Sequence, residues 1–201
     1  MFRLEAEGLA RRFHRQWVFK DINLSLSEGD NLLITGSNGS GKSTLLRILA
    51  GQLTPTKGTL KMFDGDKKID PENYYRFLSW SGPYMDLYPD LSLDETVRMH
   101  FRFRKPILPM EEIVPVLNLE KHRDKPLRNY SSGMLHRVKV GLAIFSEAKM
   151  LLLDEATTNM DPENSALVID WVKTYQQGRI LIYAGNKPEE FVHFENRLVM
   201  N

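Results

Sequence analysis

The sequence predicts an α/β fold that combines a parallel-sheet core, an amino-terminal antiparallel β subdomain and an inserted α-helical subdomain. Three short apolar runs, at residues 31–35, 150–153 and 180–184, indicate strands that are buried on both faces. Helix-forming segments lie between these runs, which is the order expected of a parallel sheet. Residues 2–6 and 22–26 instead alternate apolar and polar side chains, as half-buried antiparallel strands do.

Capping signals mark the boundaries of the first helices. Residues 43–50 have helical spacing and stop at Gly51. Ser92, with Glu95 three positions later, forms a capping box at the start of the helical subdomain, which spans about residues 92–147.

Proline signals mark the later helices. We expect three prolines to divide the helical subdomain into short helices: Pro106, Pro109 and Pro115. Between the last two buried strands, Asp161 is expected to cap a helix that has Pro162 in its first turn and stops near Gly178.

The composition is that of a folded soluble domain, with 42% hydrophobic and 26% charged residues. A length of 201 residues fits one domain, so we expect residues 1–201 to form a single unit. The chain has no cysteine, which excludes disulfides, thiolate metal sites and cysteine nucleophiles. Charged residues near Met1 argue against a signal peptide, and no apolar stretch approaches the roughly 20 residues of a membrane helix. Any membrane role therefore requires a partner.

The charge balance gives no general attraction to nucleic acid, because the formal net charge is +1. One local basic patch, at residues 11–15, fits a solvated face or an edge near nucleotide phosphates better than a nucleic-acid site. We therefore expect no nucleic-acid partner.

The clearest functional motif is a glycine-rich turn between the run at 31–35 and the helix at 43–50. It matches G-x-x-x-x-G-K-[ST] in full and comprises Gly36, Ser37, Asn38, Gly39, Ser40, Gly41, Lys42, Ser43 and Thr44. Glycines let backbone N–H groups surround phosphate oxygens, and the following helix directs its positive end at the same anion. We expect Lys42 to reach the β- and γ-phosphates of ATP and the Ser43 hydroxyl to bind Mg²⁺. A plain glycine-rich connection is the alternative interpretation.

Two carboxylates follow the second buried run. Asp154 ends that run, where ligands of open α/β sheets bind, and a carboxylate there can complete a magnesium shell. Glu155 comes next and could align and activate a water molecule beside the γ-phosphate. Taken alone, such a pair more often marks a strand end that turns into solvent; together with the phosphate loop it indicates an ATPase.

Two further stretches resemble the nucleotide-binding domain of ATP-binding-cassette (ABC) proteins, which is a P-loop NTPase. Residues 130–138 are similar to the L-S-G-G-Q signature and its basic helix, although Ser132 replaces the first glycine and Met134 the glutamine. Residues 153–161 resemble the L-D-E-P-T-S-G-L-D stretch that P-loop kinases and GTPases lack. The resemblance extends nearly from end to end of the chain.

The resemblance implies an assembly as well as a fold. ABC domains bind ATP and Mg²⁺ between two subunits arranged head to tail, so we expect a homodimer or a paired ATPase subunit. Ser131, Ser132 and Gly133 would then contact the γ-phosphate bound by the other subunit. The expected partner is a transmembrane permease subunit, and the expected location is the cytoplasmic face of the cell membrane.

At three positions this chain either departs from the family pattern or offers two residues that could match it. Phe13 lies where the family stacks an aromatic ring on adenine, and Trp17 is a rival. Gly82 or Pro83 stands where a glutamine is expected. Asn186 aligns with the switch histidine, and its amide can donate one hydrogen bond but cannot carry charge.

These departures leave alternatives to a transporter ATPase. One is a nucleotide-dependent clamp with little turnover, which Asn186 favours and Glu155 opposes. Another is a soluble ABC ATPase of DNA repair or translation, whose tandem domains or long insertions are lacking here. A P-loop kinase fits least. Within the transporters, the compact chain weakly resembles short ATPases of the haem-exporter type.

Overall fold

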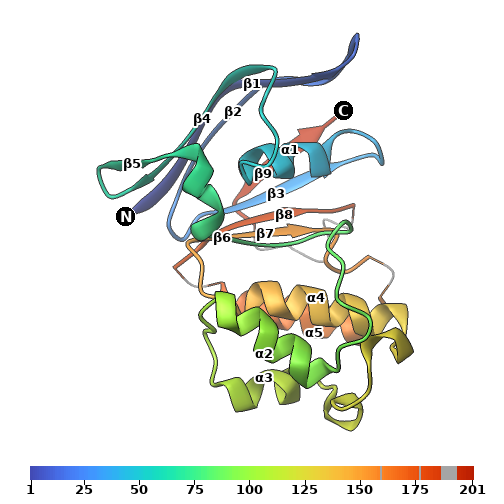
Figure 1. Cartoon of the computed structure of the whole chain (residues 1–201). Helices are drawn as coiled ribbons and strands as arrows, with labels where there is room; N and C mark the ends of the chain where they lie inside the picture. Colours follow the sequence, from blue (N-terminus) through green and yellow to red (C-terminus); the bar gives the residue numbers. More distant parts are fainter. Residues whose placement is uncertain (159, 177, 187–193) are drawn as a thin grey trace.

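A computed structural model describes residues 1–158, 160–176, 178–186 and 194–201. Its layers are seen edge-on in Figure 1: an antiparallel sheet lies at the top, α1 (Lys42–Leu49) lies beneath it, and a parallel sheet crosses the middle. Further helices cover the lower face of the parallel sheet.

The antiparallel sheet confirms the predicted amino-terminal β subdomain. Its strands follow the order β2-β1-β4-β5 and comprise β2 (Gln16–Ser27), β1 (Phe2–Phe13), β4 (Lys57–Asp64) and β5 (Lys67–Ile69). Side chains alternate on β1, where Phe2, Leu4 and Ala6 are buried and their neighbours are more exposed. The predicted alternating segments thus belong to two longer strands, which pair with each other.

The parallel sheet contains all three predicted buried strands. Its order is β6-β7-β8-β3-β9, with β6 (Leu78–Ser81), β7 (Met150–Asp154), β8 (Ile180–Ala184), β3 (Asn31–Gly36) and β9 (Asn196–Met200). Every pairing between neighbours is parallel. The carboxyl ends of β3, β7 and β8 therefore meet at one edge of the sheet, where the candidate site lies.

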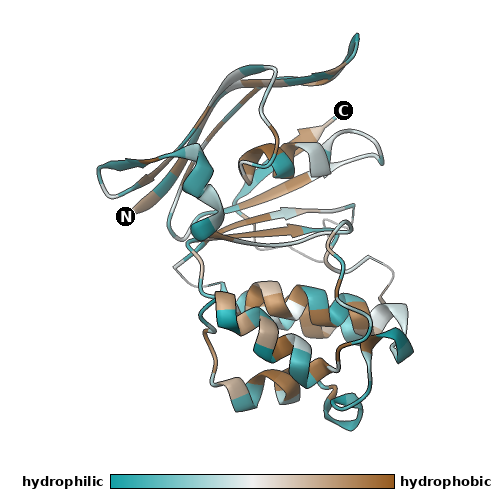
Figure 2. Cartoon of the chain, viewed as in Figure 1, coloured by the Kyte–Doolittle hydropathy of each residue, from teal (hydrophilic) through white to brown (hydrophobic). Residues whose placement is uncertain are grey.

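The parallel sheet separates two apolar cores. Leu32 and Ile34 on β3 pack toward α1 and the antiparallel sheet, whereas Leu33 packs toward the helices on the other face. Every residue of β7 and β8 is buried, and Figure 2 shows these strands as mostly hydrophobic. Burial on both faces explains why these strands read as continuous apolar runs in the sequence.

The helical layer has an inner and an outer pair. In Figure 1, α4 (Ser132–Ile144) and α5 (Pro162–Tyr175) lie under the sheet, with α2 (Leu93–Phe103) and α3 (Met110–Val116) below. Short 3₁₀ helices complete the described elements: η1 (Pro71–Arg76), η2 (Glu120–His122) and η3 (Leu127–Asn129). No helix in the described ranges is both long enough and apolar enough to cross a membrane.

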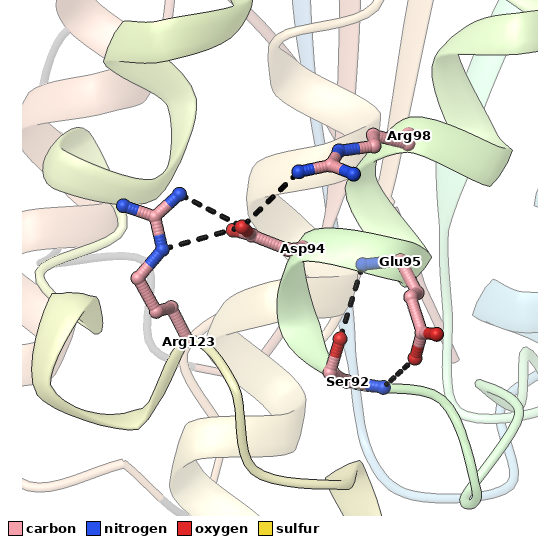
Figure 3. Close-up of polar contacts among 5 residues, drawn as sticks. All are labelled: Ser92, Asp94, Glu95, Arg98 and Arg123. Carbon is pink, nitrogen blue, oxygen red and sulfur yellow. Dashed lines mark hydrogen bonds and ion pairs between the residues drawn. The ribbon is translucent and has the colours of Figure 1, made fainter.

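The predicted capping box at the start of α2 is present (Figure 3). Ser92 Oγ accepts from the backbone N–H of Glu95 at 3.3 Å, and a Glu95 carboxylate oxygen accepts from the Ser92 N–H at 2.8 Å. Beside it, Asp94 accepts from Arg123 at 2.8 Å and from Arg98 at 3.5 Å. These contacts fasten α2 to the segment after α3.

The proline prediction is right for two of its three residues. Pro106 and Pro109 lie between α2 and α3, but Pro115 lies inside α3 and does not divide the subdomain there. A proline removes one backbone donor, and because α3 ends one residue later, little of the helix depends on that donor. The predicted Asp161 cap is confirmed: its carboxylate accepts from the N–H of Asn164 at 2.8 Å.

One buried arginine joins the ends of the inner helices. Arg179 donates to the carbonyl oxygens of Ile144 at 3.0 Å and Ser146 at 3.1 Å, and also to that of Tyr175. Burial lowers the pKa of Arg179 to about 10, so the guanidinium stays charged at neutral pH. It satisfies carbonyl groups that helix ends leave free.

Candidate functional site

The predicted phosphate loop connects β3 to α1 and requires its first and last glycines. Gly36 has a φ of +149°, and a Cβ on it would lie 2.2 Å from the Met200 carbonyl oxygen. Gly41 has a φ of +101°, and its Cβ would lie 2.4 Å from Val18 Cγ1. A side chain at either position would therefore clash with β9 or with β2.

Helix α1 presents free N–H groups to the interior of this loop. Gly41 is the N-cap and has no side chain to cap the helix, and its carbonyl accepts first from the Leu45 N–H, at 2.8 Å. The N–H groups of Lys42, Ser43 and Thr44 consequently have no partner inside the helix. Such a terminus favours an anion.

Lys42 lies folded across the loop and is only 5% exposed. Its Nζ donates to the carbonyl oxygens of Gly36 at 2.8 Å and Ser37 at 3.1 Å. The ammonium group is thus held at the mouth of the loop by neutral acceptors, and an entering phosphate would offer it a charged one.

The remaining loop residues divide into an exposed tip and a buried base. Ser37, Asn38 and Gly39 are exposed, whereas Ser40 is buried and its hydroxyl has no hydrogen-bond partner. The tip of the loop is therefore accessible to a ligand, whereas the Ser40 hydroxyl is enclosed in the base of the loop.

Asp154 is the feature that best fits a bound cation. The residue is 1% exposed, and neither carboxylate oxygen makes a hydrogen bond of acceptable geometry. Burial raises its pKa and Glu155 adds to the rise, while the nearby Ser43 hydroxyl and Lys42 ammonium oppose it. A buried carboxylate without partners is costly unless something neutralises or coordinates it. Mg²⁺ fits, because it binds one or two protein oxygens and takes its other ligands from phosphate and water.

No group of three or more acidic, histidine or cysteine side chains in the described part of the chain could hold a metal alone. Ser43 and Asp154 would therefore supply only part of a magnesium shell, and a nucleotide would have to complete it.

Glu155 begins the turn that follows β7. Its φ of +54° is uncommon for a residue with a side chain, and its backbone N–H donates to the Ala184 carbonyl at 2.8 Å. The turn is therefore fixed to the end of β8. Strained positions of this kind cluster at functional sites. Both the backbone conformation and the residue type of Glu155 therefore suit a functional role.

Asn186, just after β8, reaches the phosphate loop. Its side-chain amide Nδ2 donates to Asn38 Oδ1 at 2.5 Å. The residue expected at the switch position is therefore in contact with the exposed tip of the loop that is expected to hold phosphate.

Gly82 and Pro83, the two candidates for the family's glutamine position, follow directly after β6. A Cβ on Gly82 would lie 2.9 Å from Trp80 Nε1 and 3.4 Å from Asp154 Cβ. Gly82 is buried and Pro83 is exposed, so Gly82 is the residue that lies beside Asp154.

The signature residues lie in a different layer. Ser131 caps α4, and its Oγ accepts from the Met134 N–H at 3.2 Å. Ser131 and Ser132 are exposed, and a Cβ on Gly133 would meet no atom within 4 Å. Helix α4 and α1 cover opposite faces of the parallel sheet (Figure 1), so the structure does not join these residues to the phosphate loop of the same chain.

The two candidate adenine platforms lie on the β1–β2 hairpin. Phe13 is 44% exposed, and the Arg11 guanidinium lies 4.5 Å from its ring centroid. The Trp17 ring has cations at 5.1 to 5.8 Å from its centroid, contributed by Arg12, Lys20 and Lys57. One face of Phe13 is therefore covered, whereas Trp17 is surrounded by positive charge.

Sequence reasoning missed three residues that shape the site: Val18, Trp80 and Met200. Each lies against a glycine of the site, namely Gly41, Gly82 or Gly36. No local pattern could have found them, because each contact joins segments that are distant in the sequence or depends on how a ring folds over its own strand.

Comparisons with known proteins agree with this geometry. Residues 19–158 match the sequence model of a family described as ABC transporter. The spermidine/putrescine import ATP-binding protein PotA of Bacillus anthracis is 28% identical over 98% of this chain and 62% of its own length. The uncharacterized ABC transporter ATP-binding protein YxlF of Bacillus subtilis is 27% identical over 90% of this chain and 61% of its own. The chain thus spans about three fifths of these two relatives.

Solved structures show the same fold. A putative ABC transporter ATP-binding protein from Pyrococcus furiosus superposes with a TM-score of 0.83 at 19% identity, covering 98% of this chain and 97% of that one. A dimeric bacterial ABC transporter cassette superposes with a TM-score of 0.81 at 18% identity, covering 98% and 94%. The predicted fold class is confirmed; the haem-exporter type stays a prediction.

Proposed function

The chain belongs to the ABC transporter family, and from this premise we propose that it binds and hydrolyses ATP with Mg²⁺ to drive a membrane transporter. The observation that carries the proposal is the buried, unpartnered carboxylate of Asp154 beside the phosphate loop. Lys42 and the free N–H groups of α1 supply positive charge at the same edge of the sheet.

Each residue of the site has a proposed part in catalysis. Lys42 would transfer its hydrogen bonds from loop carbonyls to the β- and γ-phosphates, and Asp154 with Ser43 would hold the magnesium ion. Glu155 accepts a proton from the attacking water, a role that typically contributes ~10²–10⁴ in rate. Asn186 donates its amide hydrogen to the γ-phosphate. Bound Mg²⁺ would neutralise charge that develops on the phosphate oxygens.

We propose that the active form is a head-to-tail dimer. The exposed helix start at Ser131, Ser132 and Gly133 is free to donate to a phosphate held by a second copy. The solved cassette to which the chain is similar is dimeric, which supports this arrangement.

The proposed membrane partner is a permease subunit, which would hold the chain at the cytoplasmic face of the membrane. A cavity of about 450 Å³ lies between β6 and α2, with mainly apolar lining. Around it, Met85 and Phe103 are 45% and 84% exposed, and the adjacent Tyr84 is 79% exposed. Exposed apolar patches of this kind mark interaction sites, and this one is our choice for the permease contact.

The test is steady-state phosphate release by the purified chain with Mg²⁺ and ATP, alone and with its candidate permease. Glu155→Gln should keep ATP binding, abolish most turnover and accumulate a dimer that light scattering detects only when ATP is present. Ser131→Arg in the same background should prevent that dimer by filling the open helix start. A Glu155→Gln chain that hydrolyses ATP at the wild-type rate would contradict the assignment.

A nucleotide-dependent clamp is the second candidate, and Asn186 is the observation that favours it. Asparagine offers one neutral hydrogen bond where a histidine could offer a charge-assisted one. A dimer that forms with ATP in the wild-type chain, yet releases no phosphate even with the permease present, would support the clamp over the motor.

A further inference from the structure

We propose that Trp80 is a positioning residue at the nucleotide site, where its indole N–H replaces the side chain that Gly82 lacks. The inference rests on the proposed function, since it concerns how water and phosphate are held beside Asp154. It assigns a role to a residue outside the sequence motifs.

The first observation is steric. The position that a side-chain atom at Gly82 would occupy is 2.9 Å from Trp80 Nε1 and 3.4 Å from Asp154 Cβ. The indole therefore fills the volume that a longer residue at position 82 would use. Gly82 and Trp80 form a matched pair, because the ring fits only if position 82 has no side chain.

The second observation concerns hydrogen bonding. Trp80 Nε1 is buried and has no acceptor, and neither buried carboxylate oxygen of Asp154 makes a hydrogen bond of acceptable geometry, although the Ser43 hydroxyl lies nearby. Buried tryptophan N–H groups normally find a partner, since an unmade hydrogen bond is costly. The indole N–H and the carboxylate are neighbours, because Trp80 Nε1 and Asp154 Cβ both lie within 3.4 Å of the position that a Cβ on Gly82 would occupy. A water molecule beside Asp154 would satisfy both, because its oxygen accepts from the indole N–H and one of its hydrogens is donated to the carboxylate.

The third observation is the place of Trp80 in the sheet. Trp80 pairs with Leu152 on the neighbouring strand β7. Leu152 lies two residues before Asp154, so the side chains of Trp80, Leu152 and Asp154 are on the same face of the sheet. Trp80 is on the edge strand β6 and also lines the apolar cavity of about 450 Å³. Trp80 therefore borders both the cavity and the surroundings of Asp154. Its indole packs against the core on the α1 side of the sheet, which fixes its position.

Trp80→Phe tests the proposal, because it keeps an aromatic ring and removes the N–H. The measurements are the Mg²⁺ concentration that gives half-maximal ATP binding, followed by calorimetry, and the change in tryptophan emission when Mg²⁺ and ATP are added. We expect the variant to need about 3- to 10-fold more Mg²⁺, the range for one lost hydrogen bond. The wild-type emission change should shrink in the variant. Met99→Leu, which alters another cavity residue at nearly constant volume, is the matched control and should keep the wild-type Mg²⁺ requirement.

Two variants at position 82 extend the test. Gly82→Ala retains every tryptophan but pushes a methyl group against Nε1, so it should raise the Mg²⁺ requirement as Trp80→Phe does. Gly82→Gln alone should raise the Mg²⁺ requirement further, since the longer side chain has no room beside the indole. The double variant Trp80→Phe with Gly82→Gln should return most of the way to the wild-type Mg²⁺ requirement, because the smaller ring leaves space for a side-chain donor.

The outcomes separate this inference from the proposed function. A wild-type chain that binds no ATP would remove both. A wild-type chain that binds ATP normally, with an unchanged Mg²⁺ requirement in Trp80→Phe, would overturn the role of Trp80 alone. Failure of the double variant to recover would show that Trp80 acts by packing and not as a replacement donor.

Discussion

The side-chain amides of Asn186 and Asn38 are joined by a hydrogen bond of 2.5 Å, with Asn186 donating. The bond ties the segment after β8 to the tip of the phosphate loop, although 148 positions separate the two residues. A γ-phosphate on the loop would offer the Asn186 amide a charged acceptor instead of a neutral one.

Exchange of the Asn186 side chain should change turnover in both directions. We expect Asn186→His to raise the ATPase rate, since an imidazolium can donate a charge-assisted bond that is roughly twice as strong. Asn186→Ala should lower the rate by ~10- to 100-fold, equivalent to about 1.4–2.7 kcal/mol in the transition state. Phosphate release at matched protein concentration measures both effects.

The control for this prediction is Asn38→Ala, which breaks the same bond from the loop side. It should leave most of the turnover intact, because it frees the Asn186 amide for phosphate. Equal rates in the wild type and Asn186→Ala would show that Asn186 is an ordinary loop residue.

Loss of the Lys42 ammonium group should abolish ATP binding. Lys42→Ala removes the point charge at the mouth of the loop, and we expect the affinity for ATP to fall at least ~100-fold, given about 1.5–3 kcal/mol for each charged hydrogen bond. Calorimetric titration measures the affinity. Lys67→Ala, on the exposed part of β5, should bind ATP as the wild type does. Normal ATP affinity in Lys42→Ala would remove the phosphate-loop assignment.

The buried guanidinium of Arg179 should matter for stability and not for nucleotide contact. Arg179→Ala leaves the carbonyl groups of Ile144, Ser146 and Tyr175 without this donor. We expect the free energy of unfolding to fall by roughly 3–5 kcal/mol, because each of the three carbonyl groups left without a donor costs about 1–3 kcal/mol. Urea denaturation measures it, with Arg102→Ala on the exposed face of α2 as control. A loss below about 1 kcal/mol would contradict the capping role.

Acid should destabilise the helical subdomain through His100. Burial, with a contribution from Arg104, lowers the pKa of His100 to about 4, while Nε2 lies 2.8 Å from the buried Ser146 hydroxyl. Between pH 6.5 and 4, His100 binds a proton in the unfolded chain but stays neutral in the folded chain. Stability is therefore lost as the pH falls through this window, by about 3 kcal/mol in total.

His100→Gln tests this prediction, since glutamine keeps a donor for Ser146 and does not titrate. Urea denaturation at pH 6.5 and pH 4 should show a smaller acid loss in the variant than in the wild type. The pKa of His136 is also lowered by burial, but its contribution is common to both chains and cancels. Identical acid losses would rule out His100 as the cause.

The sequence was informative where local patterns decide the structure. The strands β3, β7 and β8 were predictable because burial on both faces demands continuous apolar residues. The phosphate loop was predictable because each of its glycines and its lysine has a local task. The edge strand β9 was missed, since most of its residues are exposed and it has no apolar run. The strands β4, β5 and β6 were missed as well.

Long-range packing accounts for the rest of the site. The sequence pointed to Gly82 or Pro83 in place of a glutamine, but the indole of Trp80 beside Gly82 follows from how a ring at the sheet edge folds over the next turn. The contact of Asn186 with Asn38 likewise depends on the pairing of β8 with β3. The predicted stretch at 153–161 includes Asn159, which lies outside the described residues.

The placement of Met200 against the phosphate loop has a consequence for biosynthesis. The loop is encoded in the first quarter of the chain, yet Gly36 pairs with Met200 of β9, whose side chain also approaches Gly41. Chains are made from the amino end, and contacts this far apart in sequence form late. A nascent chain therefore displays its phosphate loop without the strand that braces it until residue 200 has left the ribosome. Competence to hold a nucleotide should arise only after β9 has emerged from the ribosome, and a message cut short before β9 should yield a protein that carries every motif and lacks the brace.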